Sequence, residues 1–257
     1  MGKIIAVVNQ KGGVGKTTTC VNVCCAIHEA GRRVLLCDAD PQGNATSGMG
    51  VSKGAVELGT YAALTGACAP EEAVLPTPYG DLMAANGALA GAGIELVNTE
   101  NREFALKSVL EPLRDRYDYI LIDCPPSLEM LTLNAICAAD SLLIPVQCEY
   151  LALEGLSDLM RTLKILRRSF NHGLEIEAVV LTMFDSRTNL SYQVAAEVKK
   201  YFKDKVCRTA IPRNVRLSEA PSHGKPVLVY DSASRGARAY RDLSEEILRR
   251  CERKDGR

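Results

Sequence analysis

The stretch Lys11–Thr19, KGGVGKTTT, decides the fold of this chain. It follows the apolar run Ile4–Val8 and opens a segment of helical character, so we expect a buried strand, a glycine-rich turn and a helix N-terminus in succession. Three glycines allow a tight turn whose successive N–H groups point at one anion, and the helix dipole adds to the attraction. The pattern predicts a phosphate-binding loop in which Lys16 reaches the β- and γ-phosphates and the Thr17 hydroxyl binds Mg²⁺.

The loop departs from the usual pattern at its start. The strict motif has a glycine five residues before Gly15. This chain has Gln10 there, followed by a second lysine, Lys11. An ordinary glycine-rich turn is the alternative interpretation, but the letters GKTT directly after a strand rarely arise by chance. We therefore interpret the stretch as a variant of the phosphate-binding loop.

Three aspartates end apolar strand-like segments, where open α/β sheets place their chemistry. Asp38 and Asp40 follow Val34–Cys37, and Asp123 ends the segment YILID. Asp38 and Asp40 are two residues apart, so in an extended backbone their side chains project to the same side. There they could hold metal-bound water and orient the attacking water. Asp123 is expected to contact Mg²⁺ through a water or the Thr17 hydroxyl. A structural role in the turns that follow is the alternative for Asp40 and Asp123.

Apolar runs alternate with segments of helical character, which predicts an α/β P-loop fold with a mostly parallel twisted sheet and helices on both faces. The expected strands are residues 4–8, 34–37, 119–122, 142–146 and 176–181, with shorter ones near Leu82 and Val206. The expected helices are about 16–30, 102–116, 128–138, 152–170, 191–202 and 236–251. Residues 50–100 are expected to form loops and one short helix near 57–64. We expect one domain over residues 1–257.

Composition excludes several classes of protein. Hydrophobic content of 47% and charged content of 24% are typical of globular chains. No apolar run approaches the roughly 18 residues that a membrane span needs, and no secretory signal is evident, so we expect a cytosolic protein. The ten cysteines show no C-x-x-C spacing and are interpreted as reduced, buried thiols, with an iron–sulfur role as the alternative.

The charge is unevenly distributed although the net charge is zero. Residues 186–241 carry 12 Lys/Arg and 4 Asp/Glu, a balance of +8, which leaves −8 for the remainder of the chain. A basic C-terminal third can attract a polyanion. The alternative is that these charges only solvate helix surfaces.

Five segments together resemble one family of ATPases. They are NQKGGVGKTTT at 9–19, LLCDADPQGNATSGMGV at 35–51, LIDCPPSLEMLTLNA at 121–135, PVQCEYLALEGL at 145–156, and LTMFDSRTNL through IPRNVRLSEAPSHGKP. They resemble the deviant-Walker ATPases of the ParA/MinD superfamily, and more closely its chromosomal ParA, or Soj, branch. The likeness runs from about residue 3 to about residue 250.

The resemblance implies an ATP hydrolase that uses ATP and Mg²⁺ and has weak activity until a partner stimulates it. By this likeness Lys11, Lys16 and Asp40 are catalytic, and Asp38 supports the metal ligands with Thr17 and Asp123. The nucleotide is expected to be bound by Lys11, Gly12, Gly13, Val14, Gly15, Lys16, Thr17, Thr18, Thr19, Pro212 and Asn214, the last two at the adenine. Lys11 is expected to cross a dimer interface to the partner's ATP, with Gly12 at the same interface.

The resemblance also implies three partners: a second copy of the chain in an ATP-dependent homodimer, non-specific double-stranded DNA, and a ParB-type centromere-binding protein. Arg187 and Arg216 are the expected DNA-binding residues, unless intramolecular salt bridges engage them. A nucleoid-associated, cytoplasmic bacterial protein without membrane binding is expected.

The alternative is a MinD-type membrane ATPase, which needs a C-terminal amphipathic helix with a broad apolar face. The C-terminal segment 243–257 offers only four apolar residues for one: Leu243, Ile247, Leu248 and Cys251. A third class is a non-catalytic or metal-cluster-carrying relative.

Overall fold

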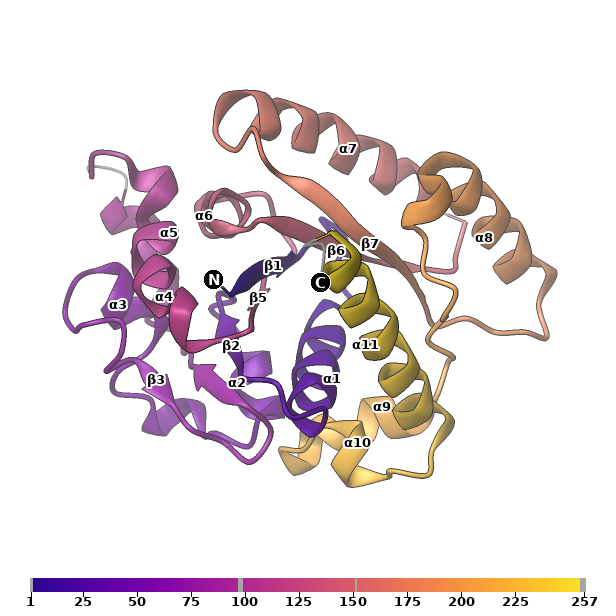
Figure 1. The fold of residues 1–257 in the computed structure, drawn as a ribbon, viewed down its shortest axis with the longest axis horizontal. Helices are drawn as coiled ribbons and strands as arrows, with labels where there is room; N and C mark the ends of the chain where they lie inside the picture. Colours follow the sequence, from indigo (N-terminus) through magenta and orange to yellow (C-terminus); the bar gives the residue numbers. More distant parts are fainter. Residues whose placement is uncertain (1, 97–98, 151, 255–257) are drawn as a thin grey trace.

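The fold is a single seven-stranded sheet with helices on both faces (Figure 1). The computed structural model describes residues 2–96, 99–150 and 152–254. The strand order is β3-β4-β2-β5-β1-β6-β7, and the pairs are parallel except for β3 with β4. The predicted α/β class and mostly parallel sheet are therefore confirmed.

The central strands are short and almost wholly buried, because helices cover both faces of the parallel sheet. The strand bounds are β1 Lys3–Val7, β2 Val34–Asp38, β3 Val74–Leu75, β4 Asp81–Met83, β5 Tyr119–Asp123, β6 Ser141–Gln147 and β7 Glu175–Thr182. The strand predicted near Val206 is wrong: this residue makes only an isolated bridge to Val179. A single bridge at the outer side of β7 adds no strand to the sheet.

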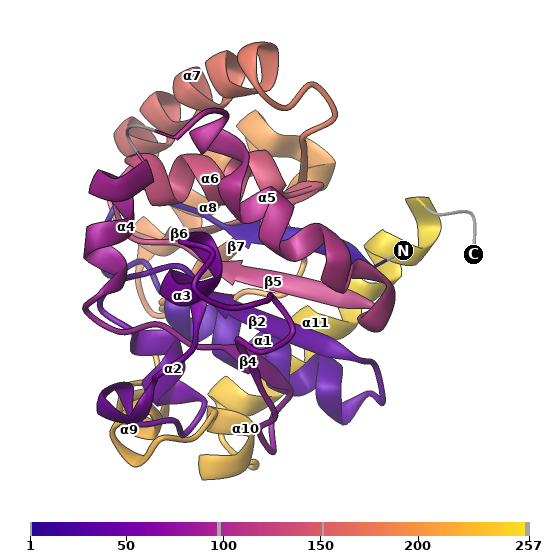
Figure 2. The same ribbon diagram turned by 90° about the vertical axis from the view of Figure 1, so that its left-hand side faces the viewer.

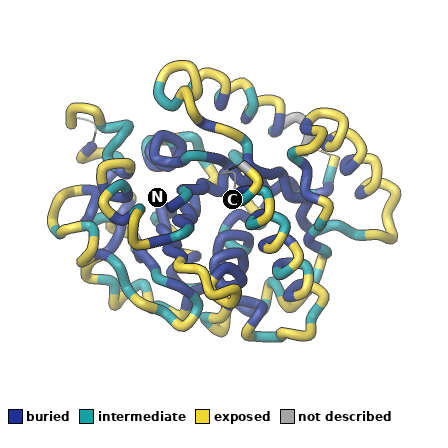
Figure 3. The backbone as a smooth tube through the Cα atoms, viewed as in Figure 1, coloured by how far each residue is buried: buried dark blue, intermediate teal, exposed yellow. Residues whose placement is uncertain are grey.

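Helices divide into two layers, which Figure 2 shows on either side of the sheet. The helix bounds are α1 Lys16–Glu29, α2 Asn44–Gly48, α3 Thr60–Leu64, α4 Leu89–Glu95, α5 Ala105–Leu110, α6 Met130–Ala138, α7 Ala152–Ser169, α8 Asn189–Phe202, α9 Val215–Glu219, α10 Val227–Tyr230 and α11 Arg235–Lys254. One core contains side chains of α4 to α8, and the other those of α1, α10 and α11. Figure 3 shows the sheet and α1 buried, with exposed outer faces on α7 and α8.

The helix predicted over 102–116 is wrong as a continuous element. It consists of a 3-10 turn at Arg102–Phe104, the short α5, and a second 3-10 segment at Glu111–Arg116. Pro112 sits near the start of that segment and cannot donate a backbone hydrogen bond, so α5 does not continue through it. The strand expected near Leu82 is β4, and residues 50–100 hold more structure than predicted because β3 and α4 accompany it and the expected short helix, α3.

The C-terminal helix α11 packs against α1 and completes the second core. Leu243, Ile247 and Cys251 are almost fully buried on its inner face. Residues 255–257 of the C-terminal segment lie outside the described residues. In the described part of the chain, the helices are all too short or too polar to cross a bilayer.

Candidate nucleotide site

The glycine-rich loop lies between β1 and α1, as predicted. Gly13 and Gly15 have φ angles of 75° and 90°, a region that glycine adopts without the penalty other residues incur. Gly15 precedes the first residue of α1 and offers no side chain to cap it, so the first N–H groups of a 14-residue helix remain open toward the loop. Such a helix start is an anion-binding site, and a nucleotide phosphate fits it.

The loop is fixed by polar side chains at the ends of neighbouring strands. The Thr182 hydroxyl, at the end of β7, donates to the carbonyl of Val14 at 2.8 Å. Asn9 accepts from the Lys11 N–H at 3.0 Å and donates to the carbonyl of Pro145 in β6 at 2.7 Å. Asn9 and Thr182 were not predicted as site residues. The sequence feature that could have identified them is their position. Asn9 follows an apolar strand and Thr182 ends one, and both side chains can form hydrogen bonds.

Lys16 provides a buried positive charge inside the loop. Its side chain is only 6% exposed, and its ammonium donates to the Lys11 carbonyl at 3.0 Å. Burial lowers the pKa of Lys16, while the carboxylates of Asp123 and Asp40 oppose that shift. An ammonium held at this position supplies charge where phosphate oxygens would lie.

Asp123 is a fully buried carboxylate at the edge of the sheet that carries the loop. It ends β5 opposite Asp38 of β2 in the sheet register, and among the described residues neither of its oxygens accepts a hydrogen bond. Burial and the charge of Asp38 raise the pKa of Asp123 to about 8, although the Thr17 hydroxyl and the Cys20 thiol lower it. Buried polar atoms are nearly always satisfied, so an orphaned carboxylate close to Thr17 fits a cation such as Mg²⁺.

Asp38, by contrast, is fully engaged by the chain. One of its oxygens accepts from the Asp40 N–H at 3.1 Å, and the other accepts from the Thr46 N–H at 2.8 Å and the Thr46 hydroxyl at 2.7 Å. Burial raises the pKa of Asp38 to about 6. These bonds tie the segment that follows β2 to the end of the strand.

Asp40 forms the turn after β2, which was the alternative role that the sequence suggested for it. Its Oδ1 accepts from the Gln42 N–H at 2.9 Å, and its carbonyl accepts from the Gly43 N–H at 2.8 Å. Within the described residues, Oδ1 is the carboxylate oxygen of Asp40 that accepts a hydrogen bond. The Asp40 side chain can therefore hold the turn with one oxygen and bind a water molecule with the other.

Lys11 lies at the mouth of the loop. Its side chain is 35% exposed and its ammonium contacts the Glu149 carboxylate, which follows β6. The neighbouring Gly12 is exposed, and a Cβ there would have one neighbour within 4 Å, the Pro126 Cβ at 3.8 Å. The ammonium of Lys11 thus points to an intrachain acid, while that of Lys16 is bonded within the loop.

The segment expected at the adenine lies beside the end of β7. Phe184 donates to the Ile211 carbonyl at 2.9 Å and accepts from the Arg213 N–H at 3.1 Å, which positions the neighbouring Pro212. Asn214 caps α9 by accepting from the Arg216 N–H at 2.9 Å. A cavity of about 450 Å³ opens next to Thr17 and Thr18, with Pro212 and Asn214 outside its lining. Its outer wall, which was not predicted, is formed by Leu217, Ala220, Pro221, Ser222 and Lys225.

The two arginines expected to bind DNA are ion-paired within the chain. Arg187 contacts both oxygens of Asp185, at 2.9 and 2.7 Å. Arg216 contacts Glu219 at 2.7 Å and Asp231 at 3.2 Å. The intramolecular alternative is therefore present in the structure. Exposed pairs of this kind contribute little to stability, so phosphate can compete for the guanidinium groups.

The cysteines have the predicted character. All ten are free, and nine are buried. Burial raises the pKa of Cys37 and Cys207 to about 12. Within residues 2–96, 99–150 and 152–254, no three His, Cys, Asp or Glu side chains form a group that could hold a metal ion.

Fold and site together define a P-loop nucleotide-binding ATPase. The family model described as "AAA domain" matches residues 2–176. The chain is 57% identical over 249 residues to the sporulation initiation inhibitor protein Soj of Bacillus subtilis, covering 96% of this chain and 98% of the relative. It is 51% identical over 252 residues to the chromosome partitioning protein ParA of Myxococcus xanthus, covering 97% and 89%. The chain belongs to the ParA/Soj family of chromosome-partitioning ATPases.

Solved structures with bound nucleotide and magnesium share the fold. A Mycobacterium smegmatis protein named cobyrinic acid a,c-diamide synthase, with bound ADP and magnesium, is similar with a TM-score of 0.87 and 38% identity, covering 100% of this chain and 97% of that one. The septum site-determining protein MinD of Pyrococcus horikoshii, complexed with Mg-ADP, has a TM-score of 0.80 and 27% identity, covering 96% of both chains. The chain is an ATP hydrolase whose cofactors are ATP and Mg²⁺.

Proposed function

We propose that two ATP-loaded copies of this chain close face to face into a dimer, in which Lys11 of each copy reaches the nucleotide of the other. The observation that carries this proposal is the position of the Lys11 ammonium, which contacts Glu149 rather than lying in the loop that Lys16 already serves. A cation at the mouth of the loop can stabilise transition-state charge on a second nucleotide, as an arginine finger does. Gly12, exposed beside it, leaves room for a close approach.

Within each active site, we propose that Lys16 neutralises phosphate charge and that Thr17, with Asp123 behind it, holds Mg²⁺. The bound cation supplies charge neutralisation at the transferring phosphate. The free oxygen of Asp40 orients the attacking water, while the turn bonded to its Oδ1 fixes the side chain. Asp38 keeps this turn in place through its bond to the Asp40 N–H. Hydrolysis stays weak until a partner completes the site.

DNA binding follows from the same dimer. Arg187, in the loop after β7, and Arg216, in α9, each supply a phosphate contact that replaces an intrachain carboxylate. Dimerisation doubles these contacts, and the logarithm of the binding constant falls with the logarithm of salt in proportion to the phosphates neutralised. ATP thus controls DNA affinity without a new fold element, and no base-specific contact is required.

The names of the relatives, chromosome partitioning proteins, support a role in segregating DNA. We propose that residues 1–257 act as one deviant-Walker ATPase domain, that the dimer associates with the nucleoid in the bacterial cytoplasm, and that a ParB-type centromere-binding protein stimulates hydrolysis and release. The MinD-type alternative is disfavoured because the apolar face of α11 is buried against the core: Leu243 is 0% exposed and Ile247 is 1% exposed.

The proposal is tested by retention on random-sequence duplex DNA with ATP, ADP or no nucleotide, at low and physiological salt. We expect retention only with ATP, decreasing with salt, and lost in Lys16→Ala and Arg216→Ala. Arg249→Ala is the matched control, since Arg249 is also an exposed arginine in an ion pair but lies on α11. If Arg249→Ala lost DNA retention to the same extent, retention would depend on the total charge of the protein and not on Arg216. Vesicle binding without DNA binding would move the protein to the membrane-associated class.

A further inference from the structure

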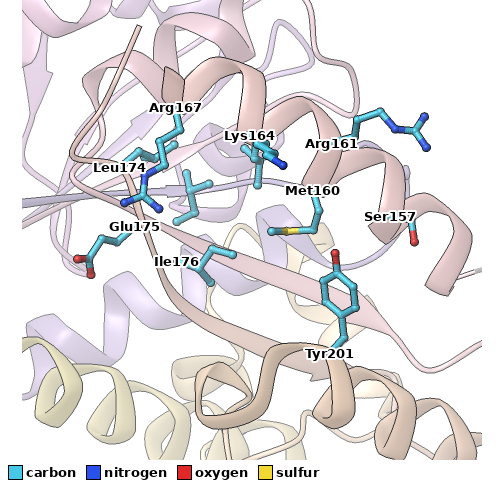
Figure 4. Close-up of a pocket in the computed structure, with 11 residues that line it drawn as sticks. Ser157, Met160, Arg161, Lys164, Arg167, Leu174, Glu175, Ile176 and Tyr201 are labelled. Atoms are coloured by element: carbon cyan, nitrogen blue, oxygen red, sulfur yellow. The ribbon is translucent and has the colours of Figure 1, made fainter. Parts of the chain in front are cut away.

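Two adjoining hollows form a trough between α7 and α8, here named the α7–α8 groove. One has a volume of about 480 Å³ and the other of about 450 Å³, and Ser157 and Tyr201 line both. The floor of the larger hollow is apolar and is contributed by α7, β6, the start of β7 and the residue that precedes β7: Leu142, Met160, Leu163, Leu174 and Ile176. Figure 4 shows Met160 and Tyr201 pointing toward one another across this hollow.

The groove has a basic rim. Lys164 and Arg167 of α7 line the larger hollow, and Lys200 of α8 lines the smaller one; all three are exposed. Lys164 and Lys200 make no ion pair or hydrogen bond with the described part of the chain. Two acidic residues, Glu175 and Glu197, also border the groove, so cations are in excess. An occupant that combines apolar side chains with carboxylates matches both the floor and the rim.

The shape favours a peptide segment over a compact ligand. The α7 residues that line the two hollows extend from Leu156 to Arg167, which spans about 17 Å along a helix axis. A trough of this length and an apolar floor accept one face of an amphipathic helix, with anchoring side chains three or four residues apart. Tyr201, 60% exposed, and Met160 provide adaptable apolar contacts for such anchors.

The strand residues on the floor of the larger hollow are remote from the nucleotide site. These residues, Leu142 and Ile176, lie near the beginning of β6 and β7, whereas Thr182, at the end of β7, holds the phosphate-binding loop. The length of β7 separates the two by about 20 Å, taking about 3.3 Å per residue. An occupant of the groove would therefore leave the loop open to nucleotide.

We propose that the α7–α8 groove docks an acidic amphipathic helix of a partner protein, and that it does so in every nucleotide state. The partner is defined by its chemistry: an apolar stripe flanked by glutamate or aspartate. This surface recruits a protein to the ATPase through contacts that do not depend on dimer closure. It is thereby independent of the proposed DNA-binding and hydrolysis cycle.

The test is fluorescence anisotropy with synthetic helices of about 18 residues, roughly 27 Å long. The panel places a leucine stripe in several registers with flanking glutamates; control peptides carry lysine for glutamate, or serine for leucine. We expect the acidic peptides to bind about tenfold or more tightly than either control at physiological salt. Nucleotide-free and ATP-bound protein should give affinities within about twofold of each other.

Variants of the full chain locate the site. Lys164→Glu with Arg167→Glu should weaken binding of the acidic peptides about tenfold or more, whereas Lys199→Glu with Lys203→Glu, an equal charge change outside the groove, should leave it within about twofold. The methyl resonance of Met160 should shift when peptide is added. Failure of the whole panel, equal binding of acidic and basic peptides, equal loss in both double variants, or an unmoved Met160 signal would overturn the proposal. Binding to anionic lipid vesicles without peptide binding would assign the groove to a membrane surface and overturn it as well.

Discussion

Replacing Gly12 by valine should separate dimerisation from nucleotide binding. In the single chain the new side chain has room: the φ angle of Gly12 is not positive, the residue is exposed, and a Cβ would meet only the Pro126 Cβ, at 3.8 Å. We therefore expect the free energy of unfolding of the monomer to change by no more than about 0.5 kcal/mol. The affinity for ATP should stay within about twofold, because Gly12 has no side chain that the loop uses.

At the proposed dimer interface the outcome differs. Overpacking a close contact costs about 1–3 kcal/mol, and a two-fold symmetric interface contains the substitution twice, so the dimer should weaken by about 2–6 kcal/mol, or roughly 30-fold to more than 10⁴-fold. Sedimentation velocity with a non-hydrolysable ATP analogue and Mg²⁺ measures this loss. Calorimetric titration of the same protein with the analogue measures nucleotide affinity separately.

Two further glycine variants make the experiment decisive. Gly54→Val adds the same side chain at an exposed position where a Cβ meets nothing within 4 Å, and it should dimerise normally. Gly13→Val forces a β-branched residue to a φ of 75°, so strain of about 1–2 kcal/mol should weaken ATP binding itself. Normal ATP-dependent dimerisation of Gly12→Val, or a loss of ATP binding equal to that of Gly13→Val, would refute the reasoning.

Three other perturbations have defined outcomes. The pKa of Asp123 is raised from 3.8 to about 8, so between these values the folded protein holds a proton that the unfolded chain has lost, and the stability of the nucleotide-free protein falls as pH rises. Asp123→Asn should flatten this fall in melting temperatures measured from pH 5 to pH 8; an unchanged slope would contradict it. Thr182→Val leaves the Val14 carbonyl unpaired and should destabilise the protein by about 1–3 kcal/mol in urea denaturation, with weaker ATP binding; unchanged stability would exclude this anchor. Glu149→Gln releases Lys11 and should strengthen the ATP-dependent dimer by at most a few-fold in sedimentation, whereas a weaker dimer would indicate that Glu149 orients Lys11 for its partner.

The order of residues was sufficient to predict the phosphate-binding loop and the central strands of the sheet that carries it. The chemistry of the loop resides in nine consecutive residues, Lys11–Thr19, and their spacing along the backbone fixes where the N–H groups and the Lys16 ammonium can point. Asp38 and Asp123 were recognisable because each ends an apolar run, and the ends of parallel strands meet at one edge of a sheet. These features depend on short-range geometry, which the order of residues specifies directly.

Which side chains contact one another across the fold could be seen only in the tertiary structure. The sequence gives no sign that Thr46 donates to Asp38 while neither oxygen of Asp123 accepts a hydrogen bond from the described residues. Nor does it show that Thr182 bonds to the loop 168 residues earlier in the chain. The same holds for the carboxylates that engage Lys11 and Arg216. Each of these contacts depends on the strand order and on which helix covers which face of the sheet. The periodicity of apolar residues indicates which side chains are buried, but it does not identify their neighbours in the folded protein.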